Sequence, residues 1–284
     1  MQKTQDLEDN MRRHSSIDEV VVSKIISITV PNLHKHLLDQ FLINNIDLIS
    51  EKTELIIVSS SVTNESLKEY RCKYPSVRFV PIKQNKGFAD TVNTGFRLSS
   101  GEWVGTVNDD VILKSGWSVD LTKNKDPRKV GSINPLIVDL NGTIESAGIK
   151  IEDKGKARCI TQKPSTAVEV DATNGACVIY SRYALSKVGL FAELFTSYLE
   201  DVDLSLRLRK AGFINIVDPT VEVIHLGHQT MNIESVKKRW LDFKNWCLVI
   251  IRNWGWKKII RNFPAICIER MRNISGIFKA LGGF

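Results

Sequence analysis

Apolar runs alternate with amphipathic segments through the first half of the chain. A strand covered by helices on both faces reads as a short continuous apolar run. Runs of this kind predict buried strands at residues 25–30, 54–58, 77–82 and 103–107. Apolar residues at helical spacing predict helices at residues 34–49, 65–73 and 88–98. This alternation is typical of a Rossmann-like α/β fold, in which a mostly parallel central sheet is flanked by helices.

Shorter elements are expected in the second half. The predicted strands are residues 130–133, 136–138, 176–180, 214–217 and 221–224. The predicted helices are residues 182–188 and 200–211. Asn141-Gly142 is a favoured hairpin turn, and Pro31 is expected to end the first strand. The polar residues 150–170 are interpreted as a flap over the sheet.

Polarity divides the chain into three parts. Residues 1–23 are polar and poor in apolar side chains, which predicts a disordered or loosely ordered leader. Residues 24–232 form the predicted α/β domain. Residues 233–284 are expected to form helices separated at Gly255 and Pro264, and they are rich in aromatic and basic side chains. We therefore expect one main domain with a basic, amphipathic helical tail.

The net charge of +7 is concentrated in this tail. From Lys237 onward there are eleven basic residues, and the only acids are Asp242 and Glu269. Basic amphipathic helices with tryptophan bind anionic membrane surfaces, so we expect such a contact here. The alternative is that the aromatic rings pack on the main domain and the charges are solvated. Nucleic acid is not expected as a partner, because the basic residues lie on a tail and not on an aromatic platform.

Composition fits an ordinary globular protein, with 43% hydrophobic and 25% charged residues. Five scattered cysteines without a C-x-x-C pair indicate neither a zinc ribbon nor a disulfide framework. No apolar run approaches the roughly 20 residues that span a bilayer, and no secretory signal is visible. We expect a cytoplasmic protein that contacts the inner face of the membrane peripherally.

Candidate chemistry begins at Asn108-Asp109-Asp110, directly after the strand at 103–107. Open α/β sheets bind ligands at the carboxyl ends of their strands. Adjacent carboxylates repel each other unless a cation or several donors neutralise them. A divalent ion that also contacts substrate phosphates would meet this need, with Asp110 as a ligand. The alternative is a solvated turn, since Asn and Asp are good turn residues.

Two further positions are expected to converge on the same crevice. His225 follows the strand at 221–224 and would be a second ligand of Mg²⁺ or Mn²⁺, with His228 as a competitor. Asp201, at the start of a helix, is the predicted general base, held ionised by the helix dipole. The alternatives are helix-start electrostatics for Glu200 and Asp203 and a satisfied strand-end histidine for His225.

Two glycine-containing segments complete the candidates. The loop at Asn85 and Gly87 resembles a phosphate cradle, although it lacks the P-loop and G-x-G-x-x-G patterns. Gly175, followed by Ala176, leaves room for an acceptor to approach the backbone. An ordinary entry into the next strand is the alternative for this segment.

The motifs together resemble a known family. In order, the chain contains Val58-Ser-Ser-Ser, Asn85-Lys-Gly-Phe-Ala, Asn93-Thr-Gly, Asn108-Asp-Asp-Val, Ser146-Ala-Gly, Asn174-Gly-Ala-Cys, Glu200-Asp-Val-Asp and His225-Leu-Gly. Over about residues 24–250 it resembles family 2 glycosyltransferases of the GT-A fold, most closely their rhamnosyltransferase-like branch. The resemblance implies inverting transfer of a sugar from a nucleoside diphosphate donor to the hydroxyl of a glycan or lipid-linked acceptor.

The resemblance also implies roles for individual residues. Asp110 and His225 would hold the metal, and Asp201 would deprotonate the acceptor. Asn32 and Ser59 would flank the nucleotide base. The remaining donor-binding residues would be Asn85, Gly87, Asn108 and Asp109, and the acceptor would meet Gly175, Ala176 and Glu200.

One departure from the family pattern concerns the base pocket. Ser59 stands where the family usually has an aspartate that reads the N–H of a pyrimidine, so weaker selectivity for uridine or thymidine is expected. The first strand also ends in Val-Pro-Asn instead of Thr-Tyr-Asn. Two other functions stay open from the residues alone. One is a non-catalytic domain that binds nucleotide sugars or carbohydrates; the other is a sugar nucleotidyltransferase, whose glycine-rich loop is absent after the first strand.

Overall fold

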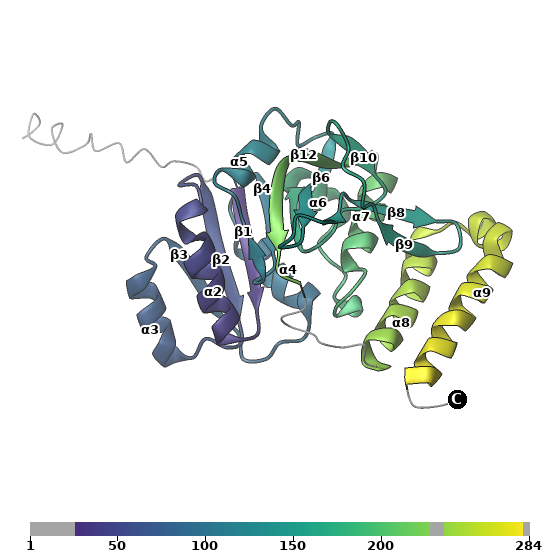
Figure 1. Ribbon diagram of the computed structural model, residues 1–284, viewed down its shortest axis with the longest axis horizontal. Coiled ribbons are helices and arrows are strands. Elements are labelled where there is room, and N and C mark those ends of the chain that lie inside the picture. Colours follow the sequence, from purple (N-terminus) through teal and green to yellow (C-terminus); the bar gives the residue numbers. More distant parts are fainter. Residues whose placement is uncertain (1–25, 228–235, 281–284) are drawn as a thin grey trace, which may run out of the picture.

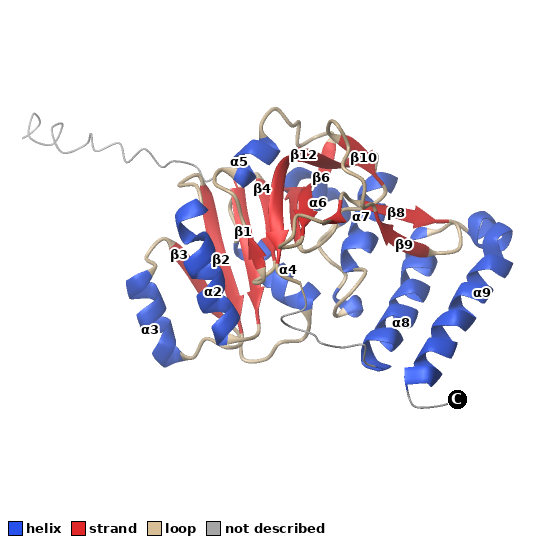
Figure 2. Ribbon diagram, in the orientation of Figure 1, coloured by secondary structure: helices blue, strands red, loops and turns tan. Residues whose placement is uncertain are grey.

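The structure is a computed structural model that describes residues 26–227 and 236–280 (Figure 1). The predicted leader and His228 lie outside the described residues. A central sheet runs through the middle of the molecule with helices on both sides (Figure 2). Two C-terminal helices stand side by side at one end (Figure 1).

The main sheet has ten strands within the described residues. Eight of them follow one another as hydrogen-bonded neighbours in the order β10-β12-β6-β11-β4-β1-β2-β3, and β5 and β7 pair off this path. Strands β1 to β4 are parallel, and β11 runs antiparallel between β4 and β6. The bounds are β1 Ile26–Asn32, β2 Thr53–Ser59, β3 Val77–Pro81, β4 Trp103–Val107, β5 Val111–Ile112, β6 Val130–Val138, β7 Ile144–Ser146, β10 Val168–Val170, β11 Cys177–Ser181 and β12 Ile214–His225. A separate hairpin joins β8 Ile149–Glu152 to β9 Lys156–Cys159.

Helices cover both faces of this sheet because its strands are apolar on both sides. In β11, Cys177 and Ile179 pack with α2, α3 and α5, whereas Val178 and Tyr180 pack with α4, α6 and α7. This alternation follows the two-residue period of a strand. The helices are α2 Lys35–Asn45, α3 Asn64–Lys73, α4 Phe88–Leu98, α5 Trp117–Thr122, α6 Arg182–Val188, α7 Glu200–Lys210, α8 Val236–Asn253 and α9 Trp256–Ala280, with short 3-10 helices η1 Ile46–Leu48 and η2 Glu193–Phe195.

The structure corrects several predicted boundaries. The first strand continues through Pro31, where β1 is paired only with β2, and a sheet tolerates proline where one side lacks a partner. Residues 130–138 form one strand, and so do residues 214–225, which bulge between Asp218 and Glu222. Pro264 lies inside α9 and does not end it. Packing of Ile266 against Ile250 and Trp254 offsets the backbone bond that proline removes.

The residues of the predicted polar flap form the β8–β9 hairpin and then β10. Helix α8 packs against the hairpin. Trp246 and Val249 of α8 share a core with Ile149 of β8 and Val202 of α7. This part of the basic tail therefore packs on the α/β domain. None of the described helices combines the length and apolar character that crossing a bilayer requires.

Candidate active site

Sheet pairing brings Asp110 and His225 together. The turn after β4 is closed by a hydrogen bond from the Val111 N–H to the Asn108 carbonyl, at 3.2 Å. Strand β5 then pairs with the end of β12, so that Val111 lies opposite His225. The Leu226 N–H donates to the carbonyl of Asp110 at 2.8 Å. The predicted convergence of these two residues therefore has a backbone cause.

The imidazole of His225 lies between two carboxylates. Its Nε2 is 3.3 Å from Asp110 Oδ1, and its Nδ1 is 2.7 Å from Glu145 Oε2. Burial opposes a charge on this ring, but the two carboxylates prevail and raise the pKa of His225 to about 9. Sequence reasoning missed Glu145. Its signal is its place after the Asn141-Gly142 turn and directly before the Ser146-Ala-Gly motif.

The residues around Asp110 fit a divalent ion that takes further ligands from a substrate. Asp110 Oδ1 is buried and accepts no hydrogen bond of normal geometry, and its polar neighbour is His225 Nε2 at 3.3 Å. Across residues 26–227 and 236–280, no three His, Cys, Asp or Glu side chains form a ready metal cluster. A site of this type offers one carboxylate and one imidazole, and leaves its other positions to phosphate oxygens and water.

The ends of β1 and β2 form a polar network beside Asp109. Asn32 Nδ2 donates to Asp109 Oδ2 at 2.7 Å, and the hydroxyls of Ser59 and Ser61 both donate to Asn32 Oδ1 at 2.7 Å. Desolvation raises the pKa of Asp109 to about 6; the Asn32 hydrogen bond opposes this shift and the charge of Asp110 adds to it. The predicted donor-side residues Asn32, Ser59 and Asp109 are thus in direct contact. Ser61 joins them and was not predicted.

Asp201 meets the backbone of the predicted acceptor segment. Its Oδ2 accepts from the Gly175 N–H at 2.8 Å, and a Cβ on Gly175 would lie 3.3 Å from the same oxygen. Ala176 follows, and its carbonyl accepts from the Asn108 N–H at 2.9 Å. The segment Gly175–Ala176 therefore connects Asp201 to the turn that carries Asp110.

The acidic pair at the start of α7 is poorly solvated. Glu200 is buried and its Oε2 has no hydrogen-bond partner, whereas Asp201 is partly exposed. Desolvation raises the pKa of Asp201 despite the backbone N–H groups of Gly175 and Val202. It raises the pKa of Glu200 as well, and the charge of Asp201 adds to that shift. Desolvation therefore outweighs the N–H donors in setting the pKa of Asp201, although these donors act in the direction that a helix start predicts.

Backbone contacts connect the two halves of the site. Asp201 accepts from the Gly175 N–H, and the carbonyl of the next residue, Ala176, accepts from the N–H of Asn108, two residues before Asp110. Asp201 and the Asp110–His225 pair therefore lie at the same edge of the sheet. The predicted base and the predicted metal ligands are thus in one region of the surface.

The loop at Asn85 and Gly87 lies against the segment that precedes α7. The Gly87 N–H donates to Asn85 Oδ1 at 2.7 Å, so the Asn85 side chain stabilises the turn. Gly87 has a φ of 130°, and a Cβ there would lie 2.5 Å from the carbonyl oxygen of Thr196. Only glycine fits this close approach, which orients the loop toward the start of α7.

Helix α8 holds the segment before Asp201. Non-glycine residues Thr196, Tyr198 and Leu199 have positive φ angles of 62°, 71° and 66°, a conformation that L-residues rarely adopt. The side-chain nitrogen of Asn245 in α8 lies 2.7–3.2 Å from the carbonyls of Phe195, Ser197 and Tyr198. Sequence reasoning missed Asn245, because an amide in an amphipathic helix carries no pattern of its own.

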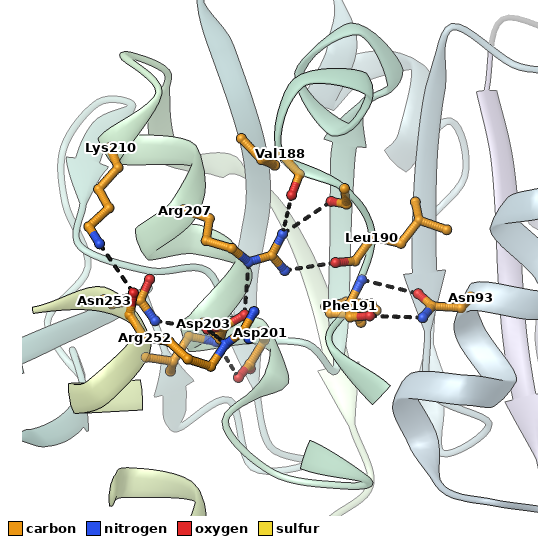
Figure 3. A network of polar contacts seen from close by, with 12 residues as sticks. Asn93, Val188, Leu190, Phe191, Asp201, Asp203, Arg207, Lys210, Arg252 and Asn253 are labelled. Atoms are coloured by element: carbon orange, nitrogen blue, oxygen red, sulfur yellow. Dashed lines mark hydrogen bonds and ion pairs between the residues drawn. The ribbon is translucent and has the colours of Figure 1, made fainter. Parts of the chain in front are cut away.

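Asp203 ties α7 to α8 (Figure 3). It is fully buried, and its carboxylate accepts from Arg207 Nε at 2.8 Å, Arg252 Nε at 2.9 Å and Asn253 Nδ2 at 2.8 Å. Arg207 also donates to the carbonyls of Val188 and Leu190. Asp203, in the first turn of α7, therefore holds α7 and α8 together from the interior of the protein.

Comparisons with known proteins identify the family of the chain. The model of the family "Glycosyl transferase family 2" matches residues 27–188. An N-acetylglucosaminyl-diphospho-decaprenol L-rhamnosyltransferase of Mycobacterium tuberculosis is 26% identical, over 72% of this chain and 76% of the relative.

Solved structures share the fold at low identity. The mannosyltransferase PcManGT of Pyrobaculum calidifontis, in complex with GDP-Man and Mn²⁺, superposes with a TM-score of 0.59 at 16% identity, over 91% of this chain and 74% of that one. GalNAc-T7 with UDP, GalNAc and Mn²⁺ gives a TM-score of 0.62 at 16% identity, over 80% and 47%. We conclude from the family match, the GT-A architecture and the relatives in glycan synthesis that this chain is a glycosyltransferase that belongs to glycosyl transferase family 2.

Proposed function

We propose that the protein is an inverting, metal-dependent glycosyltransferase. It transfers a sugar, with rhamnose as the first candidate, from a nucleoside diphosphate donor to a hydroxyl of a lipid-linked or glycan acceptor. The observation that carries this proposal is the position of Asp201, beside Gly175 and at the same sheet edge as Asp110 and His225. Rhamnose is suggested by the mycobacterial relative, which is a rhamnosyltransferase.

We infer inversion because one base, Asp201, is assigned and no nucleophile is assigned among the described residues. Asp201 accepts the proton of the acceptor hydroxyl, whose oxygen attacks the anomeric carbon from the face opposite the leaving diphosphate. Because the pKa of Asp201 is raised, its carboxylate is a stronger base than an ordinary aspartate. Gly175 and Ala176 leave space for the acceptor, and Glu200 lies beside it.

The donor is placed on the other side of the edge. Asn32, Ser59 and Ser61 would contact the nucleotide base through hydroxyl and amide groups, and Asp109 and Asn108 would lie beside the ribose and diphosphate. A Mg²⁺ or Mn²⁺ ion held by Asp110 and His225 would supply positive charge opposite the leaving diphosphate. Asn85 and Gly87 would close the pocket at the start of α4.

Peripheral contact with the inner face of the cytoplasmic membrane is also part of the proposal. Helix α9 exposes an apolar stripe with flanking lysines and arginines, a pattern that suits an anionic interface. A lipid-linked acceptor would lie in that surface. The exposed apolar residues of the stripe are Trp256, Ile260, Phe263, Met271, Ile274 and Phe278.

The test is release of nucleoside diphosphate from a panel of nucleotide sugars with Mn²⁺ and candidate acceptors. Asp201→Asn keeps the size of the side chain but removes the base, so turnover should fall about 100-fold or more. Asp47→Asn, an exposed aspartate in η1, is the matched control and should retain activity. Full turnover by Asp201→Asn would exclude Asp201 as the base. Binding of nucleotide sugars by the wild type without any turnover would instead indicate a non-catalytic domain of the same fold.

A further inference from the structure

A basic cleft lies between the β8–β9 hairpin and helices α8 and α9. Its volume is about 510 Å³. The residues that line it come from all three elements and from the loop before α7. They are Lys154, Lys156, Arg158, Tyr198, Lys238, Arg239, Asp242, Glu269, Arg272 and Asn273. None of the residues that line this cleft is assigned a role in the proposed transfer reaction.

Positive charge exceeds negative charge in this cleft. Six lining residues are cationic and two are acidic. Glu269 is shared among three cations, with Lys154 at 3.8 Å, Lys156 at 3.3 Å and Arg272 at 3.5 Å. Glu152, outside the lining, is likewise shared by Lys154 and Arg158. Since three acids face six cations, the cleft keeps a net positive potential that is focused by its walls.

A polyanion suits this arrangement better than a single carboxylate. Arginine matches phosphate oxygens with two parallel N–H donors, and lysine contributes a point charge. Next to the lining residue Glu269, the buried Arg270 donates through Nη2 to the Gly155 carbonyl at 3.0 Å. Its Nε and Nη1 have no hydrogen-bond partner among the described residues. This buried guanidinium adds to the positive field.

The cleft opens beside the candidate base. Tyr198 lines it, three residues before Asp201. Because three residues of chain span at most about 11 Å, one molecule can reach both places. An acceptor that joins a sugar to a phosphate group could place the phosphate in the cleft and the sugar beside Asp201.

We propose that this cleft binds the diphosphate of a lipid-linked acceptor while the acceptor sugar reaches Asp201. The proposal rests on the transferase function argued above. Helix α9 supports it through its two faces, since successive residues turn by about 100°. Glu269, Arg272 and Asn273 face the cleft, and the exposed stripe that includes Phe263 and Met271 lies on the opposite side. The lipid chain would pass around α9, a helix about 10 Å across, to reach the surface that meets the membrane.

The experiment compares two acceptors that share one sugar. The first carries the sugar on a short prenyl diphosphate, and the second carries it on an octyl chain without phosphate. In the variant Lys156→Gln/Arg158→Gln, kcat/KM for the diphosphate acceptor relative to the octyl acceptor should fall about tenfold or more, through KM. Both side chains are largely exposed, at 43% and 59%, so the fold should persist. Lys123→Gln/Arg128→Gln removes the same charge elsewhere and should leave the ratio unchanged.

Several results would overturn the assignment. The ratio could stay at its wild-type value, or both acceptors could lose activity equally. The variant could also lose binding to phosphatidylglycerol vesicles while keeping the ratio, which would make the cleft a site for lipid headgroups.

A binding measurement separates this proposal from the proposed function. Inorganic pyrophosphate, added without metal or donor, should protect the wild type against thermal unfolding more than the cleft variant. If the wild type turns over no acceptor but this difference is found, the transferase function fails and the anion site stands. Equal protection of both proteins would remove the anion site, whether or not the transferase is active.

Discussion

At the scale of single residues, the acidic pair Glu200 and Asp201 sets the pH dependence of the proposed reaction. Desolvation raises the pKa of both carboxyl groups, and the charge of Asp201 adds to the shift of Glu200. A base must be ionised to act, so activity should be lost as the pH falls through the raised pKa. The acid limb of kcat/KM should therefore lie at a higher pH than the pKa of an ordinary aspartate, which is about 4.

The variant Glu200→Gln tests this coupling. The charge of Asp201 raises the pKa of Glu200, whereas desolvation alone raises that of Asp201, so Asp201 ionises first, beside a neutral Glu200. Replacing Glu200 by the neutral Gln should therefore leave the acid limb close to its wild-type position. The measurement is the pH profile of kcat/KM with saturating metal. A limb that moves to clearly lower pH would show that Glu200 is charged when Asp201 titrates.

The residues at strand ends were predictable, and their partners were not. Asp110 follows β4 and His225 ends β12, and the carboxyl ends of parallel strands lie at one edge of a sheet, so sequence position alone indicated their convergence. Glu145 contacts His225 through the register of β7, and Ser61 contacts Asn32 through the course of the loop after β2. Such contacts depend on tertiary packing, which a local pattern does not specify.

At the scale of elements, α8 acts as a brace for the segment that carries the base. It contributes Asn245 to three carbonyls before α7, and Arg252 and Asn253 to Asp203 inside α7. This brace lies beyond residues 27–188, the part that the family model matches. The tail pattern predicted helices but not their contacts, because an apolar helical face fits a protein core and a membrane surface equally well.

Removal of the Asp203 carboxylate should loosen this brace. Asp203→Ala leaves the donors of Arg252 and Asn253 without their acceptor in the interior. It should lower the free energy of unfolding by about 3 kcal/mol, as expected for breaking a buried charge network. Urea unfolding followed by circular dichroism would measure the change in midpoint.

A matched control exists on the surface. Asp153 is 70% exposed and pairs with Lys258 at 3.7 Å, so Asp153→Ala should change stability by less than about 1 kcal/mol. If both variants unfold at the same urea concentration, Asp203 is not an anchor between α7 and α8.

At the scale of the whole molecule, the basic tail has one apolar surface that packs on the α/β domain and another that is exposed. Helix α8 turns its apolar side inward against α7 and the β8–β9 hairpin. Helix α9 buries Ile266 against α8 and leaves several other apolar residues exposed, Phe263 at 58% and Met271 at 63% among them. The packing interpretation of the tail therefore applies to α8 and to one face of α9, and membrane contact is proposed for the exposed face of α9.

Membrane binding should depend on this exposed face of α9. The variant Phe263→Ser/Met271→Ser removes apolar area that is already in solvent, so the protein should keep its fold while binding to phosphatidylglycerol vesicles weakens about tenfold or more. Binding should also weaken as salt screens the lysines and arginines. Ile43→Ser/Leu140→Ser, at residues that are 69% and 67% exposed on α2 and on the β6–β7 turn, is the control and should bind as the wild type does. If the α9 variant instead converts a dimer into a monomer and leaves vesicle binding intact, the stripe is a contact between two copies of the chain. The acceptor would then have to reach the cleft without help from α9 at the bilayer.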